Sequence, residues 1–364
     1  MRILITILGL SAILGLQSCS EDFTVAAPYR QITVVSGILD RDDPAHYIRI
    51  QKAFMDENKS AIDMSKEPDS SFFNNLQVKL YQYNIEQTKI LDSVELYRVD
   101  MNNEPGDYRK YDAINNQQFF TTPNYAYKFT DDGWQKDHKL SPAHWYRLLI
   151  TNLDNNHSDT SNFVGIVNSD VARAGDGFFI PDFDQAAYSL NFAKTANNGR
   201  FRLLTYMPRN GRKAEGYIHF NYTERDAATL QETKKKVVYA FDAEEGENVV
   251  NFELIALNSS IFAFLSSSIG PAPANVERYM DSCDVFVYAA SPEMHYYTTI
   301  NQGQAGGLTG DNIRPNYTNF SGSNVIGVLG SRAKRIRWSV PISDATLDSL
   351  ISNPITAPLR IRTR

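Results

Sequence analysis

The residue with the clearest chemistry is Cys19, which follows a short apolar stretch near the amino end. Arg2 is the single charge before that stretch, and the small residue Ser18 directly precedes the cysteine. A basic start, about 7–15 apolar residues and a small residue before the cut are typical of an export signal. The thiol of a cysteine that becomes the first residue after the cut can carry diacylglycerol. Residues 1–18 are therefore predicted to be a lipoprotein signal peptide, and Cys19 the lipidation site.

The alternative to lipidation is a transmembrane anchor, and the length of the apolar run weighs against it. The run from Ile3 to Leu16 is shorter than the roughly 20 residues that a helix needs to cross a bilayer. Residues 19–27 are predicted to form a lipid-anchored tether. Glu21 and Asp22 resemble the surface-export signal of outer-membrane lipoproteins in the Bacteroidetes, which implies outward display. The other interpretation of this acidic pair is the start of a solvated tether.

Carboxylates are the next residues that could do chemistry. They recur along the chain in short groups, and calcium prefers several carboxylate and carbonyl oxygens brought together. None of the groups has the twelve-residue calcium-loop spacing, and Asp is also a common turn residue, so turns are the favoured interpretation. Two carboxylates that meet in space could instead serve a glycosidase, which the sequence cannot localise. The groups are Asp40/Asp42/Asp43, Asp131/Asp132, Asp176 and Asp182/Asp184.

Sharper catalytic signatures do not occur in the sequence. The six histidines lack the close spacing of a zinc site, paired Cys-x-x-Cys ligands are missing, and no Gly-x-Ser-x-Gly elbow is present. Cys283 stands in a strand-like stretch, where a lone thiol behaves as a small core hydrophobe. We therefore predict a protein that is not an enzyme and that uses no metal or cofactor.

Composition limits the partners. The net charge is −6, whereas nucleic acids and anionic headgroups attract clustered Lys and Arg. No nucleic-acid partner is predicted, and outer-membrane lipid is expected to be reached through Cys19 alone. Phe, Trp and Tyr make up 12% of the chain. Most of these rings are expected in a β core, with a surface for sugars or peptides as the alternative; the rings weighed are Tyr125, Tyr127, Trp134, Trp145, Tyr296, Tyr297 and Trp338.

The elements that must position these residues are mainly strands. Apolar residues alternate with polar ones over 32–38, 47–51, 76–81, 145–150, 217–222 and 285–289. The first two runs flank an Asp-rich turn and predict a hairpin. The absence of strand-then-helix alternation favours antiparallel pairing. The fold class predicted is mainly β.

Two parts are expected. Residues 28–155 are predicted to form an immunoglobulin-like antiparallel β-sandwich, and residues 156–364 a second β-rich domain with one or two short helices. Residues 343–351 predict a helix capped by Ser343. The apolar stretch 252–265 suits either a buried helix or a pair of strands, and helix is favoured.

Two segments resemble a known family. Residues 34–39, the Asp-rich turn and residues 47–54 are similar to the opening of a Bacteroidetes outer-membrane lipoprotein family of unknown function (domain of unknown function 4249), and residues 291–297, 317–320 and 327–332 agree with its later part. Genes of that family often lie beside those of TonB-dependent receptors, so the resemblance implies an anchored accessory protein and a TonB-dependent receptor as partner. Ser93 and Ser349, each between Asp and an apolar residue, resemble the O-glycan acceptors of exported proteins in this group.

Three functions follow as hypotheses. The first is a lipid-anchored, surface-exposed accessory or binding protein of the outer membrane that assists a TonB-dependent transport system. The second is a surface hydrolase acting on glycans or peptides. The third is a structural or adhesive surface lipoprotein.

Overall fold

The structure is a computed structural model that describes residues 31–53, 60–106, 108–110, 120–136, 139–171, 176–193, 196–246, 251–302, 317–322 and 324–363. The predicted signal peptide, Cys19 and the tether 19–27 lie outside the described residues. Within the described ranges, no helix is long and apolar enough to span a bilayer.

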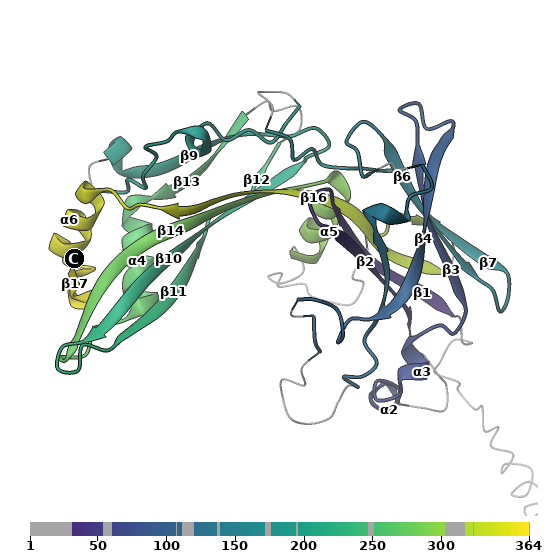
Figure 1. The fold of residues 1–364 in the computed structure, drawn as a ribbon, viewed down its shortest axis with the longest axis horizontal. Helices are drawn as coiled ribbons and strands as arrows, with labels where there is room; N and C mark the ends of the chain where they lie inside the picture. Colours follow the sequence, from purple (N-terminus) through teal and green to yellow (C-terminus); the bar gives the residue numbers. More distant parts are fainter. Residues whose placement is uncertain are drawn as a thin grey trace, which may run out of the picture.

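Two lobes share one long strand, β16 (Val325–Val340), which runs from one lobe into the other (Figure 1). Residues 325–332 of β16 pair in parallel with β1 (Ile32–Asp40) in the N-terminal lobe. Residues 332–340 pair antiparallel with β14 (Val276–Ala290) in the C-terminal lobe. Arg332 takes part in both ladders, opposite Asp40 on one side and Ala290 on the other. The lobes are thus connected through a continuous sheet, and Arg332 marks their junction.

The N-terminal lobe is a sandwich of two sheets. One sheet contains β1, β2 and β5 with the first half of β16, and the other contains β3, β6, β7, β8 and β15. Strand β4 belongs to both, because its first part pairs with β3 and its last residues pair with β5. The bounds are β2 Ala45–Ala53, β3 Leu76–Tyr83, β4 Ile90–Asp100, β5 Tyr125–Thr130, β6 Trp145–Asn152, β7 His157–Ser161, β8 Val164–Gly165 and β15 Phe320–Ser321, with α2 Ala61–Met64, α3 Pro68–Ser71 and the 3-10 turn η1 Asp131–Gly133.

Period-two burial builds the core of this lobe. Along β2, β3 and β6 the buried residues alternate with partly exposed ones, so one face of each strand turns inward. The inner faces meet around Phe129, Trp134 and Tyr146, whose neighbouring ring centroids are 6.0 Å apart. Trp134 is 4% exposed, so the sequence's preferred assignment of this ring to the core is confirmed.

The C-terminal lobe is an antiparallel sheet in the order β11, β10, β14, β16, covered on one face. The cover consists of the two-stranded sheet β9–β13 and helix α4, which meet the sheet in a core around Ile218, Phe220 and Leu254. The bounds are β9 Arg200–Tyr206, β10 Lys213–Asp226, β11 Glu232–Ala240, β12 Glu244–Glu245, β13 Asn251–Leu257, β17 Ile361–Arg362, α4 Asn258–Ile269, α5 Pro292–Gln302, α6 Asp344–Ser352, η2 Pro181–Asp184, η3 Ala196–Gly199 and η4 Ala357–Leu359.

The mainly-β class predicted from the sequence is confirmed, and so are the hairpin over β1 and β2 and the helix capped by Ser343. The hydroxyl of Ser343 accepts the backbone N–H of Thr346 at 3.3 Å. The helix favoured for 252–265 is wrong in its first half, which is strand β13, because alternate burial there fits a strand over the core. Helix α5 was not predicted.

The core of the N-terminal lobe draws on residues from either side of the sequence boundary at 155. Strand β7 pairs with β6, and β15 pairs with β7. Phe320, Val325 and Leu329 are buried in the core of the N-terminal lobe. The division at 155 and the immunoglobulin likeness stay predictions. The N-terminal lobe also includes the first part of β16, because Val325 and Leu329 are buried in its core.

Candidate binding site at the junction of the lobes

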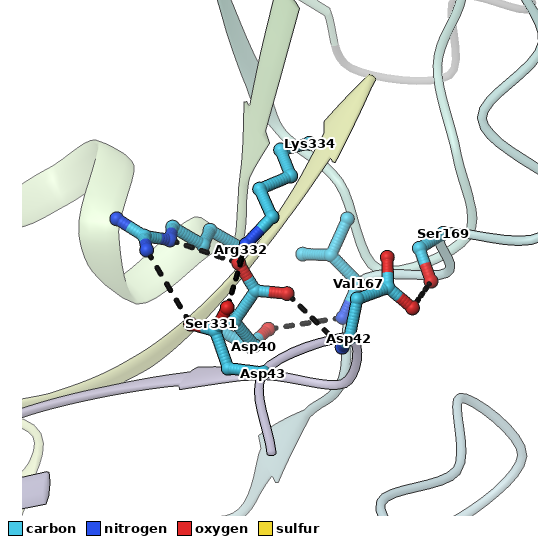
Figure 2. Close-up of polar contacts among 8 residues, drawn as sticks. All are labelled: Asp40, Asp42, Asp43, Val167, Ser169, Ser331, Arg332 and Lys334. Carbon is cyan, nitrogen blue, oxygen red and sulfur yellow. Dashed lines mark hydrogen bonds and ion pairs between the residues drawn. The ribbon is translucent and has the colours of Figure 1, made fainter. Parts of the chain in front are cut away.

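The Asp-rich turn between β1 and β2 meets the cations of β16 at the lobe junction (Figure 2). Asp40 is 1% exposed and accepts the Nε–H of Arg332 at 3.1 Å. Asp43 accepts the Nζ–H of Lys334 at 2.6 Å. The turn closes on itself through Asp42 N–H donating to Asp40 Oδ1 and Asp43 N–H donating to the Asp40 carbonyl, at 3.2 and 3.0 Å. The predicted turn is confirmed, and the cationic side chains of β16 bind Asp40 and Asp43.

The two cations differ in how firmly they are held. Burial alone would lower the pKa of Lys334, but its hydrogen bond to Asp43 and the charges of Asp40 and Asp43 outweigh that effect and raise the pKa. Arg332 uses Nε toward Asp40 and Nη2 toward Asp43, the latter at 3.6 Å, and its side chain is 40% exposed. The cluster is therefore a preformed set of ion pairs that reaches solvent on the Arg332 side.

A segment between the lobes, residues 165–170, is fastened to the same cluster. The hydroxyl of Ser331, a fully buried residue, donates to the Gly165 carbonyl at 2.6 Å and accepts the Val167 N–H at 3.0 Å. On the other side, the Ser169 hydroxyl donates to Asp42 Oδ1 at 2.8 Å, as Figure 2 shows. Arg41 adds an ion pair with Asp170 at 2.8 Å. The turn, β16 and this segment thus form one polar junction.

A polar hollow of about 570 Å³ opens on the turn's far side, and we call it the loop hollow. It lies at one end of the sandwich, where the β1–β2 turn, the end of β5 and the loop before β6 come together. Its lining includes Arg41, Asp42, Asp43, Gln82, Asp131 and Lys139. Asp131 and Lys139 pair at 3.2 Å across its wall. Charges of both signs therefore face one hollow of the size that small-molecule sites have.

Two buried side chains at this end carry polar atoms without a protein partner among the described residues. Gln82 is fully buried; its Nε2 donates to the Tyr146 hydroxyl at 2.8 Å, while its Oε1 has none. Nε2 of His46, which is 2% exposed, also has none. Burial lowers the pKa of His46, and the nearby charges of Asp131, Asp43 and Asp40 oppose that shift.

A second hollow, about 280 Å³, lies on the Arg332 side of the cluster, and we call it the sheet pocket. Its floor is the uncovered face of the sheet, with Ile38 from β1, Arg332 from β16, Tyr288 from β14 and Lys213, Glu215 and Tyr217 from β10. Helix α5 forms a wall through Met294 and Thr298. Apolar side chains and a few polar groups share its lining, which is the usual make-up of a ligand site.

The remaining carboxylate groups lie apart from the junction cluster or within ion pairs. Asp131 and Asp132 begin the 3-10 turn η1, and Asp182 and Asp184 lie in η2. Asp176 pairs with Arg209 at 2.6 Å. Within the described ranges, no three His, Cys, Asp or Glu residues lie close enough to hold a metal ion.

The other singled-out residues divide between core and surface. Cys283 is fully buried, as predicted, and burial raises the pKa of its thiol. Trp338, Tyr296 and Tyr297 are 60%, 43% and 38% exposed, so these rings are surface residues. Tyr127 is in the core, and Tyr125 and Trp145 are half-buried.

The two predicted glycan acceptors are both half-buried. Ser93 lies within β4, between paired neighbours, and the Ser349 hydroxyl donates to the Ala345 carbonyl within α6 at 2.7 Å. Glycosylation at either residue stays a prediction.

Several junction residues were missed in the sequence. Lys213, Glu215 and Tyr217 occupy alternate positions of β10, and Arg332 and Lys334 do the same in β16. The period-two alternation was a usable signal that these side chains share a face. What it lacked was any sign that β1, β10, β14 and β16 are neighbours.

The chain was compared with family models and with curated proteins. No family model matches the chain, and a search of curated proteins finds no match. The family resemblance noted in the sequence therefore stays a prediction.

Proposed function

We propose that this chain is a lipid-anchored accessory or binding protein of the outer membrane, displayed outward, that assists a TonB-dependent transport system. The anchor rests on Cys19 and the signal before it. The binding role rests on one structural observation: the loop hollow, which lies at the loop end of the sandwich beside a preformed ion-pair cluster. Loops at the end of a rigid sandwich are where recognition residues concentrate in β proteins.

The anchor is tested by comparing the two cysteines. Cys19→Ala removes the lipid acceptor, so we expect the chain to leave the membrane fraction and to lose the mass of a diacylglycerol thioether. Cys283→Ala is the matched control, because that thiol is buried in the core and away from the amino end. A Cys19→Ala chain that still fractionates with outer membranes, or a native chain with an unmodified thiol at position 19, would refute the anchor.

The partner is tested by affinity purification of the tagged chain from solubilised outer membranes of its own host. We expect a barrel-type receptor to be recovered with it. The Asp131→Ala variant, which alters the loop hollow, should reduce that recovery, whereas Asp132→Ala should not, because Asp132 does not line the hollow. Repeated recovery of the lipoprotein alone would count against a transport partner.

A surface hydrolase is the second candidate, because the loop hollow brings together carboxylates far apart in the sequence. Asp42 and Asp43 come from the β1–β2 turn and Asp131 from the end of β5. Paired carboxylates are the groups that glycoside hydrolysis needs. Aryl glycosides and fluorogenic peptides provide the assay: a hydrolase would lose turnover in Asp131→Asn and keep it in Asp132→Asn. Hydrolysis no faster than the blank removes this candidate.

A further inference from the structure

The sheet pocket contains a buried lysine, which is an unusual lining group for a mainly apolar hollow. The Lys213 side chain is 4% exposed. A buried ammonium is costly unless it is paired and hydrogen-bonded. Its Nζ lies 3.2 Å from Glu215 Oε1 and donates to the Thr298 hydroxyl at 3.4 Å. An ammonium has three N–H donors, so these two contacts leave one donor for a further acceptor.

The carboxylate beside Lys213 is shared with other groups. Glu215 receives the hydroxyl of Tyr217 at 2.9 Å as well as the ammonium of Lys213. Burial, the hydrogen bond and the charge of Glu215 together raise the pKa of Tyr217 to about 12. Tyr217 therefore keeps its proton and stays a donor to Glu215 at neutral pH. Glu215 is thus held within the pocket's own network by both neighbours.

The described residues that line the sheet pocket include two cations and one carboxylate. Lys213 and Arg332 are cationic, and Glu215 is the acidic group among the described lining residues. The contacts of Arg332 to Asp40 and Asp43 use Nε and Nη2, so the N–H groups of Nη1 are not used by these two ion pairs. An anionic group entering the pocket would meet donors from two cations without displacing an existing ion pair.

The rest of the lining is apolar or aromatic. Ile38 is 38% exposed at the edge of the hollow, and Met294 of α5 faces the same sheet surface, since a Cβ built on Gly330 would lie 2.5 Å from it. Tyr217 and Tyr288 lie side by side with ring centroids 6.0 Å apart. These rings offer a planar apolar body a surface to pack against.

We propose that the sheet pocket binds the carboxylate of a small organic acid with an aromatic or aliphatic body. The carboxylate would accept from Lys213 and Arg332, and the body would pack against the two tyrosines, Ile38 and Met294. This assignment goes beyond the proposed function, because the sheet pocket is a separate site from the loop hollow. The same carboxylate could be supplied by a free acid or by the carboxyl end of a peptide.

The test uses the full chain in detergent and para-fluorophenylacetate as the probe, followed by fluorine NMR. We expect saturable binding, and about tenfold or weaker affinity for the neutral para-fluorophenylacetamide, because a charge-assisted hydrogen bond is lost. The Gly-Gly-Phe tripeptide and its carboxyl amide separate the two sources: displacement of the probe by the free tripeptide but not by the amide assigns the pocket to peptide ends, and displacement by neither assigns it to free acids.

Variants locate the site. Lys213→Met should weaken probe binding about tenfold or more, whereas Lys236→Met, on the exposed strand β11, should leave it unchanged. Ile38→Glu adds a negative charge at the exposed edge of the pocket and should also weaken acid binding, which keeps the test decisive if Lys213→Met does not fold. Absence of binding, equal affinity for acid and amide, or acid binding unchanged in Ile38→Glu would overturn the proposal. The binding assay contains no receptor, so a negative result there would not bear on the proposed transport role. Conversely, failure to recover a receptor would not bear on acid binding in the sheet pocket.

Discussion

Ser331→Ala is the substitution that tests the junction most directly. The change removes one oxygen from a fully buried side chain. It leaves in place the Ser291 N–H that donates to the Ser331 carbonyl and the Ser331 N–H that donates to the Ser291 hydroxyl. What disappears is the hydroxyl that joins β16 to residues 165–167, through the Gly165 carbonyl at 2.6 Å and the Val167 N–H at 3.0 Å. The substitution therefore probes the fastening of that segment and little else.

The expected loss of stability follows from the two groups left behind. Val167 is fully buried, so its N–H has no access to water once the hydroxyl is gone. An unsatisfied buried polar group costs about 1–3 kcal/mol, and a carbonyl that loses one of two acceptor bonds costs less. We expect the free energy of unfolding to fall by about 2–4 kcal/mol. The cavity contribution is small because a single oxygen is removed.

Urea unfolding measures this loss, and hydrogen exchange locates it. Ser349→Ala is the matched control, since the half-buried Ser349 hydroxyl donates to a carbonyl within its own helix α6, and such a change stays within about 0.5 kcal/mol. The Val167 amide should exchange faster in Ser331→Ala and not in Ser349→Ala. If the two variants were equally stable, or if exchange at Val167 did not change, the reasoning about the junction would be wrong.

Two further predictions concern single residues in the N-terminal lobe. Burial lowers the pKa of His46 below 6.5, so below pH 6.5 the unfolded chain binds more protons than the folded chain. The free energy of unfolding is therefore unaffected by His46 above pH 6.5 and decreases as the pH falls from 6.5 toward the lowered pKa. In His46→Gln, the free energy of unfolding measured in urea should depend less on pH over that range. An unchanged slope would contradict this. Gly327→Ala should prevent folding or abolish the β1–β16 pairing by circular dichroism, because φ is +135° and a Cβ would lie 1.9 Å from the Val35 carbonyl oxygen. Gly270→Ala, with φ +73° and open space, should cost only about 1–2 kcal/mol.

Local features of the fold could be predicted because their causes are local. Alternating apolar residues predicted β1, β2, β3 and β6, and Ser343 predicted the start of α6, where it accepts a hydrogen bond from the Thr346 N–H. The stretch 252–265 is mostly apolar, so composition alone could not show that its first half is a strand over the core and its second half a helix. Ser291, followed by Pro292 and Glu293, is a local signal for the start of α5.

The candidate site could not be predicted, because it depends on pairing between distant parts of the chain. The partners Asp40 and Arg332 are 292 residues apart in sequence, and nothing in either segment indicates a parallel ladder between β1 and β16. The aspartates were recognised as a turn, while the lysine and arginine that bind them were not. In the same way, the alternation predicted over 217–222 began after Lys213 and Glu215, and it gave no sign of the helix that faces them.

The place of β1 in the sheet has a mechanical consequence. The first described strand lies between β2 and β16, paired along most of its length on both sides. Tension applied to the amino end would therefore pull β1 lengthwise between two neighbours, a geometry in which many hydrogen bonds share the force and must fail together. A body tethered by that end would resist shear from flowing medium far better than one whose outermost strand could be peeled away bond by bond.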